Sequence, residues 1–313
     1  MNRKSKVVDA NRSELVKNAL YYEYSTSANP IEQGYISEIP FIVFPHNLHE
    51  EGETRVIPLD ISDKLRTPYL ATTPGLLANF VRIKSGEQLS TSPNASSQIF
   101  YVMRGEGYTE FNKKRIPWSR GDFFVLPAGP EATHSADTDS AFYYIHDEPL
   151  LTYLGVKAST ARFEPTLFMK ERVYAELQKA IDSSHGTRRS RLSILLANKE
   201  FPQTRTVTHV LWSMFGVLPV STVQPPHRHQ SVAIDFAVEC QKGCYTLMGK
   251  ELNKSGEIVD PIRADWQSQS VFITPPGYWH SHHNESGVQA HLIPMQDAGL
   301  QTYLRSLDIK FKS

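Results

Sequence analysis

The sequence predicts an all-β protein with two antiparallel barrels or sandwiches in tandem, joined by a helical segment. Short apolar runs separated by Gly and Pro turns occur on both sides of a single stretch with helical spacing. The two β-rich regions also end alike, because residues 147–154 and 297–304 share the pattern Asp-x-x-Leu-x-Thr-Tyr-Leu. A repeat at equivalent places indicates a duplicated domain.

Composition bounds the function. The 313 residues give room for two domains. Lysine plus arginine equals aspartate plus glutamate at 33 each, so no net field would attract nucleic acid or an anionic membrane. No apolar run reaches the length of a membrane span, and no apolar segment follows the basic N-terminus. Cys240 and Cys244 are too few for a disulfide framework, so we expect a reduced, cytoplasmic protein.

The first half is predicted to hold an N-terminal extension, residues 1–60, and a first barrel, residues 61–160. The extension contains one strand-like run at 40–44, followed by His46 and His49 in an expected solvated loop. The expected strands of the barrel are 77–83, 97–103, 108–111, 123–127 and 141–145.

A helical linker, residues 161–205, is predicted to follow. Glu164 and Pro165 favour a first helical turn, and apolar residues continue at helical spacing until about residue 183. The basic run at 188–191 is expected to be solvated. The β pattern then returns in a second barrel, residues 206–313. One expected strand, 191–197, lies just before this barrel. The expected strands within it are 206–217, 232–240, 245–248, 270–274 and 289–293.

Three histidines of the second barrel have the spacing of metal ligands. His227 and His229 are one residue apart next to a strand, so their side chains share a face. His280 follows a Pro-Pro-Gly turn about fifty residues later. If its strand pairs beside the first, the three imidazoles converge. Three neutral imidazoles suit Fe(II), Mn(II), Ni or Zn and leave coordination positions for substrate.

These residues resemble the cupin superfamily, and specifically a bicupin of the gentisate 1,2-dioxygenase, salicylate dioxygenase and 1-hydroxy-2-naphthoate dioxygenase group. The matching runs are 188–197, 206–212, 225–236 and 275–284, and the likeness covers most of residues 75–313. The resemblance implies two jelly-roll barrels and an iron centre with His227, His229 and His280 as ligands. It also implies that Trp212 lines the substrate pocket and that His282 contacts substrate or passes protons.

Two positions depart from that group. Asp235 replaces an arginine that grips the substrate carboxylate, and counting by twos from His229 points it into the barrel. A buried carboxylate needs a partner. It would be a fourth ligand, a contact for a cationic or hydroxyl-bearing substrate, or the partner of a nearby basic residue. Gly216 replaces a glutamine and would enlarge the cavity. Both changes predict a substrate other than gentisate.

The first barrel lacks the ligand pattern. Residues 92–94, Ser-Pro-Asn, stand in place of His-x-His, and His134 is assigned to the third ligand position. We therefore expect a structural, metal-free barrel, with His134 as a satisfied rim residue.

Three functions fit these residues. The leading hypothesis is an Fe(II)-dependent dioxygenase that acts with O2 on a small hydroxy- or amino-substituted aromatic or related chelating substrate, with His282 moving a proton. The second is an O2-independent, metal-dependent isomerase, lyase or cyclase with Asp235 as base. The third is a non-catalytic binding bicupin. The resemblance also implies a homo-oligomer.

Overall fold

The structure is a computed structural model that describes residue 12 and residues 14–184 and 192–312. The chain divides into two units, residues 1–38 and 39–313. The first unit contains a short helix, α2 (Tyr24–Ser27), whose N-terminal amides donate to the Glu23 carboxylate. The second unit contains all the strands described below. No helix in the described part of the chain has the length and apolar character needed to cross a membrane.

The first barrel consists of two antiparallel sheets. The larger has the order β11-β8-β5-β10-β3-β2, and the smaller has the order β4-β9-β6-β7. The strands are β2 (Arg55–Pro58), β3 (Leu77–Ile83), β4 (Gln88–Thr91), β5 (Ser97–Arg104), β6 (Glu106–Phe111), β7 (Lys114–Ser119), β8 (Phe123–Pro127), β9 (Ala132–Ala136), β10 (Ser140–His146) and β11 (Thr166–Phe168).

The second barrel has the same construction. Its larger sheet has the order β1-β18-β15-β20-β13-β12, and its smaller sheet has the order β17-β16-β19-β14-β21. The strands are β1 (Val43–Phe44), β12 (Leu192–Leu196), β13 (Trp212–Leu218), β14 (Thr222–Arg228), β15 (Ala233–Glu239), β16 (Cys244–Gly249), β17 (Ile262–Asp265), β18 (Val271–Thr274), β19 (Trp279–Asn284), β20 (Ala290–Gln296) and β21 (Lys310–Phe311).

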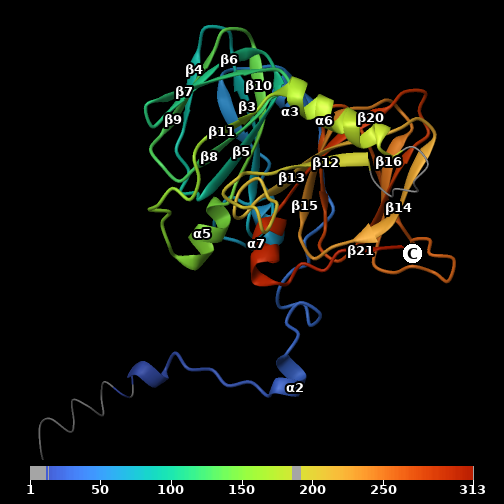
Figure 1. Ribbon diagram of the computed structural model, residues 1–313. Coiled ribbons are helices and arrows are strands. Elements are labelled where there is room, and N and C mark those ends of the chain that lie inside the picture. The colour runs from blue at the N-terminus through green and yellow to red at the C-terminus, as the bar shows by residue number, and fades with distance from the viewer. Residues whose placement is uncertain (1–11, 13, 185–191, 313) are drawn as a thin grey trace, which may run out of the picture. The chain divides into compact units, whose positions relative to one another are not determined.

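The two barrels are copies of one topology. The central order β8-β5-β10-β3 of the first recurs as β18-β15-β20-β13 in the second, and β4-β9-β6-β7 recurs as β14-β19-β16-β17. The helices α5 (Glu148–Leu154) and α7 (Ala298–Leu304) follow equivalent strands. Figure 1 shows the two β regions side by side, with α6 (Lys170–Asp182) running along them. The predicted duplication of a jelly-roll unit is therefore confirmed.

The sheets extend beyond the predicted barrel boundaries. β1 and β2 come from the predicted extension and pair with β18 and β3, in different barrels. β12 comes from the predicted linker and pairs with β13. The predicted helix was too long, because residues 166–168 form β11 and the helix begins at Lys170. Edge strands this short have almost no periodic pattern, so whether such a segment becomes a strand depends on the neighbouring strand with which it pairs.

The largest apolar cluster lies where the two larger sheets pack together. Tyr143 of the first barrel stacks on Phe236 of the second, with ring centroids 4.9 Å apart, and its hydroxyl donates to the carbonyl of Ile234 at 3.1 Å. Inside the first barrel, Phe100 stacks on Phe124 and on Tyr144 at 4.5 and 4.1 Å. Aromatic rings therefore fill that interior, whereas the second interior has a smaller apolar cluster and several buried polar side chains.

Candidate metal centre

The structure brings the three predicted histidines together. His227 lies at the end of β14, directly opposite His280 at the start of β19, and His229 follows β14. Their ring centroids are 4.0 Å apart for His227 and His280 and 4.9 Å for His229 and His280. One nitrogen from each ring lies within 4.8 Å of the other two. Among the described residues, this is the group of three or more candidate ligands that could hold a metal ion.

Backbone carbonyls orient two of these rings. Nδ1 of His229 lies 2.8 Å from the carbonyl oxygen of Ser231, and Nδ1 of His280 lies 3.0 Å from that of Tyr278. A carbonyl can only accept, so Nδ1 is the protonated nitrogen and Nε2 has the lone pair. This is the arrangement by which proteins hold a histidine for metal binding.

The donor set fits a transition-metal ion. All three imidazoles are at most 2% exposed, so the ligands are shielded from bulk water. Three neutral nitrogens on one side of a cation leave its other positions for exogenous ligands. Such a set suits Fe(II), Mn(II), Ni(II) or Zn(II).

His282 lies beside the triad on the same face of β19. Its ring centroid is 5.7 Å from that of His280 and 6.0 Å from that of His227. Its Nδ1 lies 2.7 Å from the hydroxyl of Thr246, which accepts the indole N–H of Trp266 at 2.8 Å. Sequence reasoning missed Thr246 and Trp266, because their place opposite His282 follows from the pairing of β16 with β17 and β19.

Asp235 occupies the interior of the second barrel, as the alternation along β15 predicts. It is 2% exposed, and its carboxylate accepts a hydrogen bond from the hydroxyl of Thr274 at 2.6 Å. Among the described residues it is not one of the grouped ligands, so the geometry does not support Asp235 as a fourth ligand.

Trp212 and Gly216 are four residues apart on β13, so their side-chain positions lie on the same face of the strand. Leu218, which belongs to the apolar cluster inside the second barrel, lies on that face too. Gly216 borders a small cavity next to His282 and Trp266. A Cβ on Gly216 would lie 2.4 Å from Oγ of Ser193 on the neighbouring strand β12, so the serine side chain occupies part of the space beside the glycine.

The first barrel requires a correction at His134. His134 lies opposite Thr109 as His282 lies opposite Thr246, so His134 is the counterpart of His282. The third ligand position instead corresponds to Ala132, which pairs with Thr91 where His280 pairs with His227. His134 is fully buried, not a rim residue. Its Nδ1 lies 2.8 Å from Thr109 Oγ1 and its Nε2 lies 3.0 Å from Thr91 Oγ1.

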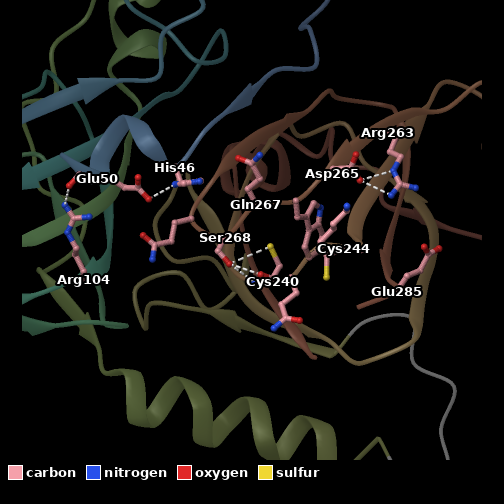
Figure 2. A pocket seen from close by; sticks show the side chains of 15 residues that line it. His46, Glu50, Arg104, Cys240, Cys244, Arg263, Asp265, Gln267, Ser268 and Glu285 are labelled. Atoms are coloured by element: carbon pink, nitrogen blue, oxygen red, sulfur yellow. Dashed lines mark hydrogen bonds and ion pairs between the residues drawn. The ribbon is translucent and has the colours of Figure 1, made fainter. Parts of the chain in front are cut away.

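The residues that line a large cavity of about 1150 Å³ do not include His227, His229 or His280; Figure 2 shows this cavity. The turns around Cys240 and Ser268 line it together with His46 and Glu50. Burial raises the pKa of the Cys240 thiol to about 11, so this thiol stays protonated at neutral pH.

His46 and His49 do not lie in a solvated loop as expected. The residues after His46 form a helix, α3 (Asn47–Glu50), and His49 of this helix is buried against Phe80 at a ring-centroid distance of 4.6 Å.

The chain is similar to known proteins, over part of its length in sequence and over nearly all of it in fold. No family model matches the chain. The chain is 30% identical over 95 residues to a 5-aminosalicylate 1,2-dioxygenase from Comamonas sp. and 31% identical over 83 residues to a gentisate 1,2-dioxygenase from Streptomyces sp.. The matched segments are 30% and 26% of this chain and 25% and 23% of those relatives, so the chain matches about a quarter of their length.

Solved structures match over nearly the whole chain. A salicylate 1,2-dioxygenase from Pseudoaminobacter salicylatoxidans, described with gentisate, superposes with a TM-score of 0.73 at 14% identity, covering 100% of this chain and 95% of that one. Another structure of that enzyme gives a TM-score of 0.72 at 16% identity, covering 96% of each chain. At such low identity the likeness concerns the fold. The expected tandem cupin fold is thereby confirmed.

Proposed function

We propose that this chain, which has the tandem cupin fold, is an Fe(II)-dependent dioxygenase of small aromatic acids carrying hydroxy or amino substituents, or of related chelating substrates. The observation that supports the proposal most is the buried group of His227, His229 and His280, with Nδ1 of two rings held by backbone carbonyls. The names of the relatives support the same class of reaction.

The three histidines would hold the iron. When bound, Fe(II) offers positions for a chelating substrate and O2 and lets electron density pass between them. The contribution of the chain is to fix the three rings on one side and to keep water off them, because all three are buried. Binding the substrate and O2 side by side at one metal ion would remove the entropic cost of bringing the two reactants and the metal together in solution.

His282 would move a proton at the substrate. Its ring lies next to His280, and the Thr246 hydroxyl at its Nδ1 would leave Nε2 as the nitrogen that exchanges a proton with the substrate. An imidazole is suited to this task because one of its ring nitrogens can donate a proton while the other accepts one.

Asp235 would set substrate choice. A carboxylate inside the metal-bearing barrel accepts N–H or O–H hydrogen bonds and disfavours a second carboxylate beside it. This supports a substrate that presents an amino or hydroxy group toward β15, rather than one held there by its carboxylate. Trp212 and Gly216, on the inward face of β13, would form another side of the same pocket.

Oxygen uptake tests the proposal. Apo protein is reconstituted with Fe(II) under anaerobic conditions and mixed with aerated salicylate, gentisate, 5-aminosalicylate and related amino- and hydroxybenzoates. We expect uptake with at least one amino- or hydroxy-substituted acid and none with a His280→Ala variant. An iron-loaded wild type that consumes no O2 with the whole panel would contradict the proposal.

The buried carboxylate of Asp235 favours one alternative, an O2-independent metal-dependent isomerase, lyase or cyclase in which Asp235 is the base. Turnover that continues without O2 and is supported by Zn(II), Ni(II) or Mn(II) would identify that activity.

A further inference from the structure

The C-terminal segment of the chain lies against the candidate metal centre. β21 pairs antiparallel with β14, with Phe311 opposite His227 and Lys310 opposite Arg228 (Figure 1). On its other side, His227 pairs with His280 of β19. Side chains directly opposite one another on adjacent strands project from the same face. Phe311 and two of the three ligands therefore form one row across three strands.

The ring of Phe311 covers one flank of His227. The two ring centroids are 6.0 Å apart and the ring planes differ by 18°, which is an offset stack. The exposed fractions are 1% for His227 and 54% for Phe311. Phe311 thus faces solvent at the sheet edge, while the ligand behind it is shielded from water.

Hydrogen bonds on both sides of His227 and His229 hold the C-terminal segment, residues 308–312, in place. The backbone N–H of Lys312 donates to the carbonyl of Pro226 at 2.9 Å, and that of Asp308 donates to the side-chain oxygen of Gln230 at 3.0 Å. The ammonium of Lys312 also donates to the carbonyl of Ser255 at 2.7 Å. Since residues 226 and 230 flank His227 and His229, the segment is fastened to the end of β14 and to the turn after it, which together carry both histidines.

We propose that β21 is a wall of the metal centre and that Phe311 is a positioning residue for His227. Its ring limits rotation of the imidazole and keeps water from the side of the ligand that faces the sheet edge. The inference rests on the part of the proposed function that assigns a divalent cation to the three histidines, and it does not depend on the reaction with O2. Loss of a hydrogen-bonded partner of a metal ligand typically changes metal affinity by about 10- to 100-fold, and we expect a stacked ring to lie at the lower end of that range.

Metal affinity of the full chain tests this role. Apo protein is titrated with Co²⁺ in the presence of a competing chromophoric chelator, and release of bound Co²⁺ into excess EDTA is timed. We expect Phe311→Ala to weaken Co²⁺ affinity by about tenfold and to speed release by a similar factor. Phe311→Tyr keeps the stacked ring and should restore both values.

Two further variants separate positioning from folding. Lys310→Ala is the matched control, because it changes the same strand at a side chain whose ion pair with Asp308 is exposed, and it should bind Co²⁺ like wild type. Phe311→Leu keeps an apolar cover but no ring face, so its affinity should fall between those of wild type and Phe311→Ala. It serves as the test if Phe311→Ala fails to fold.

The outcomes are distinguishable. A wild type that does not bind Co²⁺ would remove the metal centre and the proposed function with it. A wild type that binds, with Phe311→Ala and Phe311→Leu both within twofold of it, would overturn the role of Phe311 and leave the proposed function standing.

Discussion

His134 and His282 occupy the same position in the two barrels, each with Nδ1 against the hydroxyl of a threonine that accepts a tryptophan N–H. In the first barrel Thr109 lies 2.8 Å from His134 and takes the indole of Trp118 at 3.0 Å. In the second, Thr246 and Trp266 hold His282 at 2.7 and 2.8 Å. The duplicated unit thus retains the same anchored imidazole, and in the second copy this imidazole lies next to His227 and His280 of the candidate metal centre.

This pair gives a matched test of His282. Thr246→Val and Thr109→Val each leave a buried indole N–H and an imidazole nitrogen without their hydroxyl, which should cost about 1–3 kcal/mol of unfolding free energy in both variants. Only Thr246→Val should also lower kcat of the iron-loaded enzyme, and Thr246→Ser should restore it. Denaturant unfolding and steady-state kinetics measure the two effects. Equal kcat losses in the two valine variants would argue against a special role for His282.

Burial of His134 predicts acid sensitivity. Desolvation lowers its pKa to about 3, against an ordinary value of 6.5. The unfolded chain therefore binds a proton first, so the contribution of His134 to stability is complete above pH 6.5 and is lost as the pH falls toward 3. The loss is about 1.4 kcal/mol per pH unit in that window. Denaturant unfolding of apo protein between pH 7 and pH 4.5 should show a smaller slope for His134→Gln than for wild type. Identical slopes would refute this assignment.

Asp297 should act in the opposite direction. Burial raises its pKa to about 6 from 3.8, although the backbone N–H of Val232 donates to it at 3.1 Å. The folded state holds the proton longer, so stability from this group is present below about pH 4 and is lost as the pH rises through about 6. Asp297→Asn should remove about 3 kcal/mol of that decline. The measurement is unfolding free energy against pH for the variant and wild type. A variant with the wild-type profile would show that folding does not raise the pKa of Asp297.

The space at Gly216 can be tested by paired substitutions. Gly216→Ala places a methyl group 2.4 Å from Ser193 Oγ, and overpacking of this kind typically costs about 1–3 kcal/mol. Ser193→Gly removes the obstructing side chain, so the double variant should recover much of the loss. Thermal unfolding of the two single variants and the double variant gives the coupling. Additive effects would mean that the two side chains do not compete for this volume.

The sequence by itself determined the duplicated β architecture and the motifs that contain the three candidate ligands. Both signals are local: the strand periodicity and turn residues lie within each repeat, and His227 and His229 stand in one short motif whose alternation gives them a common face. The approach of His280 to them required the pairing of β14 with β19. Asp235 was placed in the interior by the same alternation.

Only the tertiary structure decided which residues of different strands lie opposite one another. It made His134 the counterpart of His282 rather than of His280, placed Ser193 against Gly216, buried His49 of α3 against Phe80, and set Phe311 beside His227. Register between distant segments and the pairing of two- or three-residue edge strands have no periodic signature in the sequence, because they are fixed by the packing of the whole barrel.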